Sequence, residues 1–419
     1  MTESVGHAES VSVWHNRRFL RFWAGNTISQ FGDQITGLAF PLIATITLQA
    51  SATAVAALTA ALWIPNLFAL PIGTWVDHHP NKRRVLITAE LIQAGAIATV
   101  PIEHALGLVT MPLLYTSAVL LGAGGVLGGT ASQPFFVRLV ARHQYIQANS
   151  LQSTTQSASG IAGPAIGGLL IAALTAPAAM IIDAVSFLVS ATAITTIAIP
   201  PSPPDTATES FLRRLTNGTR YLFHQPYLRV SLGCSTTMNF AAFVIQALLV
   251  LYASRYLHLS AGLIGTALGL GATGGLAGAI TAARLAREIG TGWTIATGAA
   301  LSCAPFAVLS VAGILVGHKV GLVVLLAVIE FVSSLGIMWF DINNNAVRTI
   351  VTEDAMRSRV SGAYSTINYG IRPVGAIIGG LFATHIGLPA TLIGAATLGT
   401  AAILWLIPTA TRIRAIDRL

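Results

Sequence analysis

The chain has 419 residues, of which 54% are hydrophobic and only 9% are charged. An average soluble domain contains about 25% charged residues, so this composition excludes an ordinary soluble enzyme. Cys234 and Cys303 both fall in apolar segments, which excludes a disulfide framework or a cysteine-based metal cluster. The mean hydropathy of +0.72 and the long uncharged runs instead predict an integral membrane protein.

Apolar windows of about 20 residues, the length needed to cross a bilayer, recur along the whole chain. The first set lies at residues 18–48, 53–76, 85–104, 110–137, 147–175 and 177–199. The second set lies at residues 227–257, 261–284, 291–316, 320–348, 357–385 and 387–409. We therefore predict an all-α membrane protein with twelve transmembrane helices. No cleavable signal peptide is expected, because the first apolar segment is too long and contains Asp33.

A polar stretch between the two sets begins with a Pro-rich run, Pro200–Pro204. Its second part places Phe211, Leu215 and Leu222 on one helical face, which predicts an amphipathic helix on the inner leaflet or a solvated linker helix. We expect three parts: an N-terminal six-helix bundle at 1–199, a cytoplasmic linker at 200–226 and a C-terminal six-helix bundle at 227–419.

The basic residues predict the topology. If both termini are cytoplasmic, 20 of the 23 Lys and Arg residues fall on the inner side, as the positive-inside rule requires. Arg255 and Lys319 fall outside, and Arg372 lies within a helix. The basic residues that give the formal net charge of +8 therefore lie at the cytoplasmic surface of the cell membrane, next to the lipid bilayer. No nucleic-acid partner is expected.

Two stretches of the chain resemble each other. The sequence GIAGPAIGGLL at 160–170 matches GIRPVGAIIGGLF at 370–382, and each follows a short basic loop. Repeats of this kind are typical of transporters built from two related halves. We expect two pseudo-symmetric halves of six helices each.

The loop between the second and third predicted helices reads GTWVDHHPNKRR. Gly73 permits close helix contact, and Asp77 can pair with Arg or stabilise a helix N-terminus beside the basic cluster Lys82, Arg83 and Arg84. This loop resembles the signature of the major facilitator superfamily, a resemblance that spans the whole chain. It implies the major facilitator fold and a conformational role for these five residues; a basic loop that only fixes topology is the simpler alternative.

Three further stretches resemble the exporters of that superfamily. GPAIGG at 163–168 is similar to the core of the antiporter motif of drug exporters, and Gly163–Pro164 predicts a hinge or a static kink. IDAVSF at 182–187 and GIRPVG at 370–375 resemble the branch that contains macrolide and enterobactin exporters. The resemblance implies a conformational role for the residues of the first motif: Gly163, Pro164, Gly167 and Gly168.

Ionisable groups within a bilayer are costly and mark functional sites. By depth, Asp33 and Glu330 fall near the midplane, and Arg372 is the one cation placed there, so we expect it to pair with an acid or to attract an anionic substrate. Burial favours a protonated carboxyl group and a nearby cation favours a charged one, so Asp33 can exchange a proton, and Glu330 is the second candidate for this role; interhelical hydrogen bonding is the alternative. Glu90 and Asp341 lie nearer the cytoplasm, and we interpret them as structural partners of Arg and Asn groups there; Asp341 could instead belong to an inner gate with the asparagines at 343–345. Asp183 lies nearer the outside, and we interpret it as a packing residue rather than a coupling residue.

Polar stripes on three predicted helices face protein or water, because lipid cannot satisfy them. In the superfamily these helices line the central cavity, which implies substrate contacts for the following residues: Asn26, Gln30, Asn239, Phe243, Gln246 and Ser334. The histidines show no paired metal-ligand spacing within a helix, and no nucleotide-binding loop occurs. We expect no metal and no cofactor.

The predicted function is secondary active transport: export of a small amphiphilic compound, such as a macrolide-like drug or a secreted metabolite, coupled to proton entry by a monomer. An uncoupled facilitator or importer of a sugar or metal chelate is the first alternative. A lipid-modifying membrane enzyme is the second, but the acids lie on separate helices without a His or metal partner. A scaffold or receptor would leave the polar stripes without a purpose.

Overall fold

The computed structural model describes residues 12–198, 211–310, 318–353 and 356–409. The described residues are almost entirely helical and contain no strand. The first part of the chain forms α1 (Arg17–Leu42), α2 (Ala52–Trp63), α3 (Ala69–His78), α4 (Lys82–Ala105), α5 (Met111–Leu139), α6 (Tyr145–Leu174) and α7 (Ala176–Thr195). The second part forms α8 (Phe211–His224), α9 (Pro226–Arg255), α10 (Ala261–Ile289), α11 (Thr291–Cys303), α12 (Phe306–Leu309), α14 (Lys319–Val351), α15 (Arg357–Ile386) and α16 (Leu388–Ala401).

Each of the predicted apolar ranges coincides with helical structure, but three of them are interrupted. The second range bends at the 3-10 turn Ile64–Phe68, which has Pro65 at its start and joins α2 to α3. The ninth breaks between α11 and α12 at Pro305, and its residues 311–316 lie outside the described part. The twelfth changes from α16 into the 3-10 segment Ala402–Thr409. Proline lacks a backbone N–H and clashes with the preceding turn, so it ends regular helix at the first two breaks.

The described chain contains ten helical segments that are long and apolar enough to cross a membrane. They include the continuous segment Ala52–Val76, made of α2, the 3-10 turn and most of α3. The helices α1 and α15 are 26 and 30 residues long but carry more polar and charged side chains. The protein is a multi-pass membrane protein.

Polar side chains fix the starts of five helices. In each case the residue before the helix accepts a hydrogen bond from a backbone N–H of the first turn, which would otherwise lack a partner. These N-cap residues are Asn16, Ser51, Asn81, Gln225 and Ser260. Local chemistry therefore determines where these helices begin.

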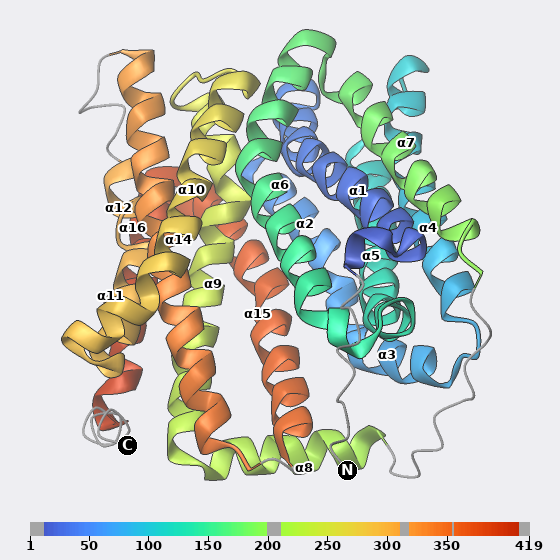
Figure 1. The fold of residues 1–419 in the computed structure, drawn as a ribbon. Helices are drawn as coiled ribbons and strands as arrows, with labels where there is room; N and C mark the ends of the chain where they lie inside the picture. Colours follow the sequence, from blue (N-terminus) through green and yellow to red (C-terminus); the bar gives the residue numbers. More distant parts are fainter. Residues whose placement is uncertain (1–11, 199–210, 311–317, 354–355, 410–419) are drawn as a thin grey trace, which may run out of the picture.

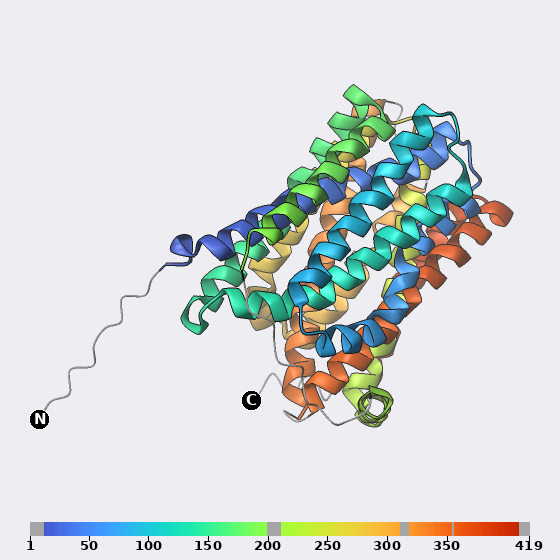
Figure 2. The ribbon, with the colours of Figure 1, turned by 90° about the vertical axis from the view of Figure 1, so that its right-hand side faces the viewer.

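The amphipathic helix α8 lies across one end of the bundle (Figure 1), and Figure 2 shows it end-on in yellow-green. It packs against α9 and α15, and Leu222 is fully buried in this contact. The side chains of Phe211 and Leu215, and the linker residues 199–210, lie outside the described part. We call the end of the bundle opposite α8 the distal end.

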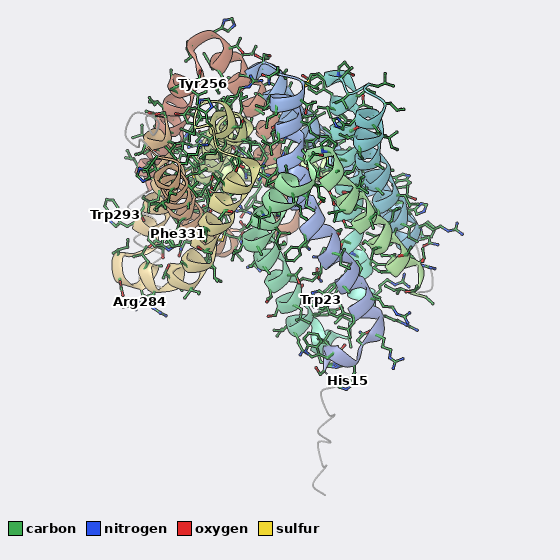
Figure 3. All side chains as sticks on the ribbon, turned by 90° about the horizontal axis from the view of Figure 1, so that it is seen from above. His15, Trp23, Tyr256, Arg284, Trp293 and Phe331 are labelled. Atoms are coloured by element: carbon green, nitrogen blue, oxygen red, sulfur yellow. The ribbon has the colours of Figure 1, made fainter. Side chains whose placement is uncertain are left out.

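Helices from the first part of the chain gather on one side and those from the second part on the other when the molecule is seen from above (Figure 3). The main contacts between the two parts are α6 with α10 and α2 with α15. Hydrogen bonds join them at the distal end: Arg255 donates to the carbonyl oxygen of Thr45 at 2.7 Å, and Thr53 donates to that of Gly380 at 3.0 Å. The two parts are therefore tied together far from α8.

The buried apolar side chains form three clusters, and their distribution agrees with these contacts. One cluster combines residues of both parts, among them Ile35, Leu248 and Ile264. A second, around Leu222 and Tyr227, contains only residues of the second part. The third, around Phe19, contains only residues of the first part. Among the described residues, the α8 end thus has two separate cores and the distal end has a shared one.

Candidate functional site: a central polar cavity

A cavity of about 1840 Å³ lies between the two parts of the chain. Binding pockets for drug-sized molecules occupy roughly 300–1,000 Å³, so this one has room for a large ligand. Apolar residues and glycines form most of the wall, and polar side chains are set into it from α1, α9, α14 and α15. Among these polar residues are Asp33, Asn239, Gln246, Glu330, Asp341 and Arg372.

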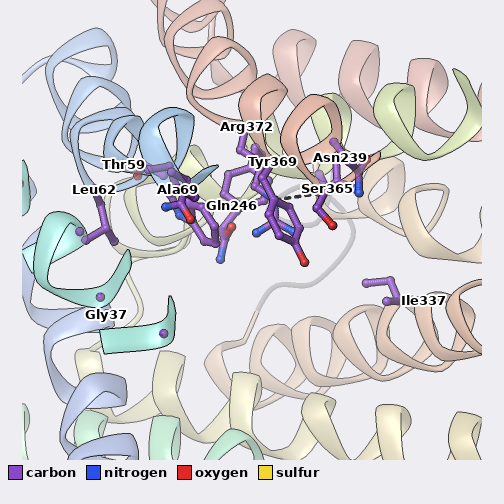
Figure 4. Close-up of a pocket in the computed structure, with 18 of the residues that line it drawn as sticks. Gly37, Thr59, Leu62, Ala69, Asn239, Gln246, Ile337, Ser365, Tyr369 and Arg372 are labelled. Carbon is purple, nitrogen blue, oxygen red and sulfur yellow. Dashed lines mark hydrogen bonds between the residues drawn. The ribbon is translucent and has the colours of Figure 1, made fainter. Parts of the chain in front are cut away.

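Arg372 of α15 sits among aromatic rings on the cavity wall. Its guanidinium carbon lies 4.3 Å from the ring centre of Trp63, 4.8 Å from that of Phe243 and 4.2 Å from that of Tyr369. Its Nε donates a hydrogen bond of 3.1 Å to Oδ1 of Asn239 (Figure 4). Cation–π contacts of this kind stabilise a desolvated cation without neutralising it.

The expected ion pair between Arg372 and an acid is absent from the described structure. No carboxylate oxygen lies within 4.0 Å of the guanidinium, and Asp341 acts on it only through longer-range attraction. The aromatic rings and Asn239 occupy the flanks of the side chain instead. The prediction failed because stacking partners on α2, α9 and α15 come together only in the tertiary structure.

Three acids of the first part lie near one another: Asp33 on α1, Glu90 on α4 and Asp183 on α7. Asp183 is fully buried and accepts hydrogen bonds from Thr36 and, at 3.1 Å, from Ser186. Oε2 of Glu90 is buried without a hydrogen-bond partner in the described structure. Only Asp33 of the three lines the cavity. The acids form a buried cluster with a single member exposed to the cavity.

Helix depth alone did not predict this cluster. Their depths in the sequence separate the three acids, and Glu90 was expected to pair with cytoplasmic Arg and Asn groups, but Ser190 of α7 is the polar group that interacts with its carboxyl group. The signal that could have indicated the cluster is Gly32, beside Asp33. A Cβ atom at Gly32 would lie 2.5 Å from Oγ of Ser186 and 3.1 Å from Cγ of Asp183. This glycine allows α1 to approach α7 closely enough to group the carboxyl groups.

A second polar network joins α9, α14 and α15 nearer the α8 end. Oδ1 of Asn344 accepts hydrogen bonds from Tyr227 at 2.9 Å and from Ser231 at 2.7 Å. The hydroxyl group of Tyr364 lies 3.1 Å from that of Ser231, and the guanidinium carbon of Arg348 lies 3.8 Å from the Tyr364 ring centre. Sequence reasoning missed this network because an isolated tyrosine in an apolar segment is indistinguishable from a packing residue.

The structure divides the sequence-predicted substrate residues into two groups. Asn239, Phe243 and Gln246 line the cavity together with Asp33, Glu330 and Arg372. Asn26, Gln30 and Ser334 lie outside the cavity lining. Gln30 accepts a hydrogen bond of 3.5 Å from Ser159 on α6, and Ser334 faces Gly275 on α10. These two contact neighbouring helices because a polar stripe is wider than the face that a helix presents to the cavity.

The basic cluster after α3 contacts the ends of helices. Lys82 is buried and donates to the carbonyl oxygen of Val76 near the end of α3. Arg83 donates to the last turn of α7, to the carbonyl oxygens of Ile194 (3.1 Å) and Thr195. These carbonyl groups lie in the last turns of α3 and α7, where the helix dipole places partial negative charge, so the cations stabilise both helix ends. Gly73 lines the cavity, and the side chain of Asp77 lies outside the described part.

Substituting Arg83 by Ala is expected to lower the free energy of unfolding by about 1–2 kcal/mol, because two carbonyl groups at the end of α7 lose a charged donor. The matched control is Arg84→Ala, whose side chain is exposed and has no partner among the described residues. Thermal unfolding of the purified variants in one detergent measures both. Equal stability of the two variants would contradict the role of Arg83 as a helix cap.

The four motif residues of α6 place this helix between α1 and α10. A Cβ atom at Gly163 would lie 2.8 Å from Cβ of Gln34, and one at Gly167 would lie 3.1 Å from Cα of Ile35. Gly168 faces the other way: its Cβ would lie 2.5 Å from the carbonyl oxygen of Ala261 and 3.0 Å from Cα of Gly265. Pro164 lies inside the helix and lines the cavity. Gly163 and Gly167 therefore permit close packing within the first part, and Gly168 permits the close contact with α10 that joins the two parts.

A bundle of apolar helices around a large cavity with polar side chains set into its apolar wall, tied at one end and separate at the other, defines a membrane transporter for small molecules. The Major Facilitator Superfamily family model matches residues 22–372, and the chain belongs to this superfamily. This confirms the family predicted from the loop at 73–84. The chain is similar to the multidrug efflux pump Tap of Mycobacterium tuberculosis, with 28% identity over 375 residues that cover 87% of each chain.

Solved structures of low sequence identity share the fold. A bacterial homologue of the iron transporter ferroportin in its inward-facing state has 17% identity and a TM-score of 0.72, covering 93% of this chain and 98% of that one. A structure of such a homologue in the outward-facing state gives a TM-score of 0.58, covering 95% of this chain and 99% of that one. Both likenesses concern the arrangement of helices. The chain is a transporter rather than an enzyme.

Proposed function

We propose that this protein exports a small amphiphilic compound and couples its export to the entry of protons. The observation that carries the proposal is the central cavity, which combines an apolar wall with Asp33 and Glu330. A cavity of about 1840 Å³ suits a bulky, weakly polar substrate better than a sugar. The name of the mycobacterial relative, a multidrug efflux pump, supports the direction and the substrate class.

Transport proceeds by alternating access between two six-helix halves, residues 1–199 and 227–419, joined by the linker 200–226. In this proposal α1 and α15 also cross the membrane, which gives twelve spans. The helix pairing supports the symmetry: the similar stretches 160–170 and 370–382 lie on α6 and α15, and each of these helices packs against the opposite half, on α10 and α2. The protein acts as a monomer with both termini and α8 on the cytoplasmic side, in agreement with the basic residues at that end.

The conformation is inward-facing in this proposal. The shared apolar cluster and the contacts of Gly168 close the distal end, while the two cores at the α8 end are separate. The higher TM-score to the inward-facing relative of known structure supports this assignment. A substrate would enter from the cytoplasm and leave when the distal contacts open.

Asp33 carries the coupling proton. It is the member of the acid cluster that lines the cavity, so it is the one of the three that a proton or a substrate in the cavity can reach directly. Exposure to water on the other side of the membrane would favour release of the proton. Glu330, which lines the cavity from the other part of the chain, is the second coupling group. Arg372 adds a positive charge to the cavity that both acids line, which favours the charged form of a carboxyl group there.

The experiment uses purified protein in liposomes that contain a pH-sensitive dye. An imposed pH gradient is applied, and a panel of weakly charged amphiphilic drugs is added while lumenal pH is followed. We expect at least one compound to move protons only in liposomes that contain the protein. Radiolabel flux of that compound then gives the direction. A compound that equilibrates at the same rate without a gradient, and moves no protons, would indicate an uncoupled facilitator instead.

A further inference from the structure

We propose that Arg372, Trp63, Phe243 and Tyr369 form a binding site for the carboxylate group of an aromatic organic acid. This inference deepens the proposed export function by naming a substrate class, amphiphiles with an acidic end. It rests on that function for its biological role, but its chemistry can be tested by binding alone. The site lies on the wall of the central cavity.

The guanidinium group has unused hydrogen-bonding capacity. Arg has five N–H donors in a planar fork, and among the described residues only Nε has an acceptor, Oδ1 of Asn239. Nη1 and Nη2 lack one. Asn239 is itself held in place, because its Nδ2 donates to Oδ1 of Asn368 at 3.2 Å and to the carbonyl oxygen of Ser235 at 3.1 Å. The guanidinium group is thus held through Nε, and Nη1 and Nη2 can both donate to a ligand.

The surroundings leave the positive charge without a direct counter-ion. No carboxylate lies within 4.0 Å in the described structure, and Asp341, which lines the same cavity, attracts the guanidinium only from a longer distance. An isolated charge in a membrane-spanning region is expensive. A carboxylate ligand would neutralise it with two parallel hydrogen bonds, the geometry for which Arg is preferred over Lys.

The aromatic rings favour a ligand whose carboxylate group is attached to an aromatic body. Trp63 and Phe243 pack edge to face with ring centres 5.1 Å apart, and Tyr369 contacts the same guanidinium. Aromatic rings prefer edge-to-face or offset contact with other rings. A flat apolar body beside the acid group would extend this stack into the cavity, which has the volume to hold it.

The test compares two probes of the same shape and different charge, 1-naphthaleneacetate and 1-naphthaleneacetamide, by isothermal titration of the detergent-purified full chain at neutral pH. We expect the acetate to bind about tenfold more tightly than the amide, the size of a charge-assisted hydrogen bond. Arg372→Gln keeps a polar group beside Asn239 and should abolish this preference. Arg372→Lys keeps the charge without the planar fork and should retain part of it.

Lys319→Gln is the matched control, because it removes one positive charge at the exposed start of α14, outside the cavity lining. It should leave the preference unchanged, and size-exclusion profiles report whether each variant folds. Equal affinity for the two probes in the unaltered protein would overturn the proposal. So would a preference that appears only after Asp341→Asn, because Asp341 would then be the natural counter-ion of Arg372. The binding test needs no proton gradient, so a failure to detect proton coupling in liposomes would not affect the binding result. Equally, a failure to detect carboxylate binding would not affect the test of proton coupling.

Discussion

Asp33→Asn is expected to abolish accumulation of substrate against a gradient while leaving substrate binding intact. With one proton per substrate, a gradient of one pH unit supports about tenfold accumulation, and the variant should reduce this ratio to about one. The reason is that Asn has nearly the same shape as Asp but cannot exchange a proton. Asp33 lines the cavity, so its neutral replacement also avoids a buried unpaired charge. Radiolabel accumulation in proteoliposomes measures the effect.

The control for this variant is Glu288→Gln, which also removes one carboxylate but at an exposed ion pair with Arg284. It should transport like the unaltered protein. Glu330→Gln is measured in parallel, because Glu330 lines the same cavity. Full uphill transport by Asp33→Asn, together with its loss in Glu330→Gln, would transfer the coupling role to Glu330. Full transport by both variants would exclude either acid as the only proton carrier.

Gly168→Leu is expected to slow transport severely by preventing closure of the distal end. A Cβ atom added at this position would lie 2.5 Å from the carbonyl oxygen of Ala261, so a branched side chain would force α6 away from α10. Overpacking of this kind costs about 1–3 kcal/mol, which corresponds to a shift of about 5- to 150-fold in a conformational equilibrium. The population should move toward the state that is open at the distal end.

Cysteine labelling reports this shift. Ala56 is fully buried in the described structure, on α2 beside Gly380 of α15, so Ala56→Cys should react faster with a membrane-impermeant reagent when Gly168→Leu is present. The background lacks the two native cysteines, which are buried. The control is Gly160→Leu on the same helix, where a Cβ atom would meet nothing within 4 Å. Equal labelling in both variants would show that the α6–α10 contact does not hold the distal end closed.

The sequence predicted the helical class and the family because these depend on local patterns. Apolar runs of span length can only be helices in lipid, since no other open structure satisfies its backbone hydrogen bonds there. The described helices follow those runs closely, with breaks at Pro65 and Pro305. The loop from Gly73 to Arg84 indicated the superfamily, and the family match confirmed it. The depths of Asp33, Glu330 and Arg372 in the membrane could be predicted because each residue of an α-helix adds a fixed rise along the helix axis.

The partners of those residues depended on the tertiary structure. Arg372 was expected to meet an acid, but its neighbours are Trp63, Phe243 and Tyr369, from three different helices. Asp183 was interpreted as a packing residue near the outer side, and the approach of α1 at Gly32 brings it near Asp33. The helical period of 3.6 residues predicts which residues share one face of a helix. It does not predict which neighbouring helix packs against that face.

Sequence by itself therefore determined which segments are helical and apolar and which charged groups they contain, because solvation in lipid acts on each segment separately. Only the tertiary structure decided which charges share an environment, where the cavity lies and at which end the two parts share a core. The physical reason is that glycines such as Gly32 and Gly168 permit contacts without specifying the partner. Helix tilt and packing, which involve residues far apart in the chain, then select the neighbour of each polar side chain.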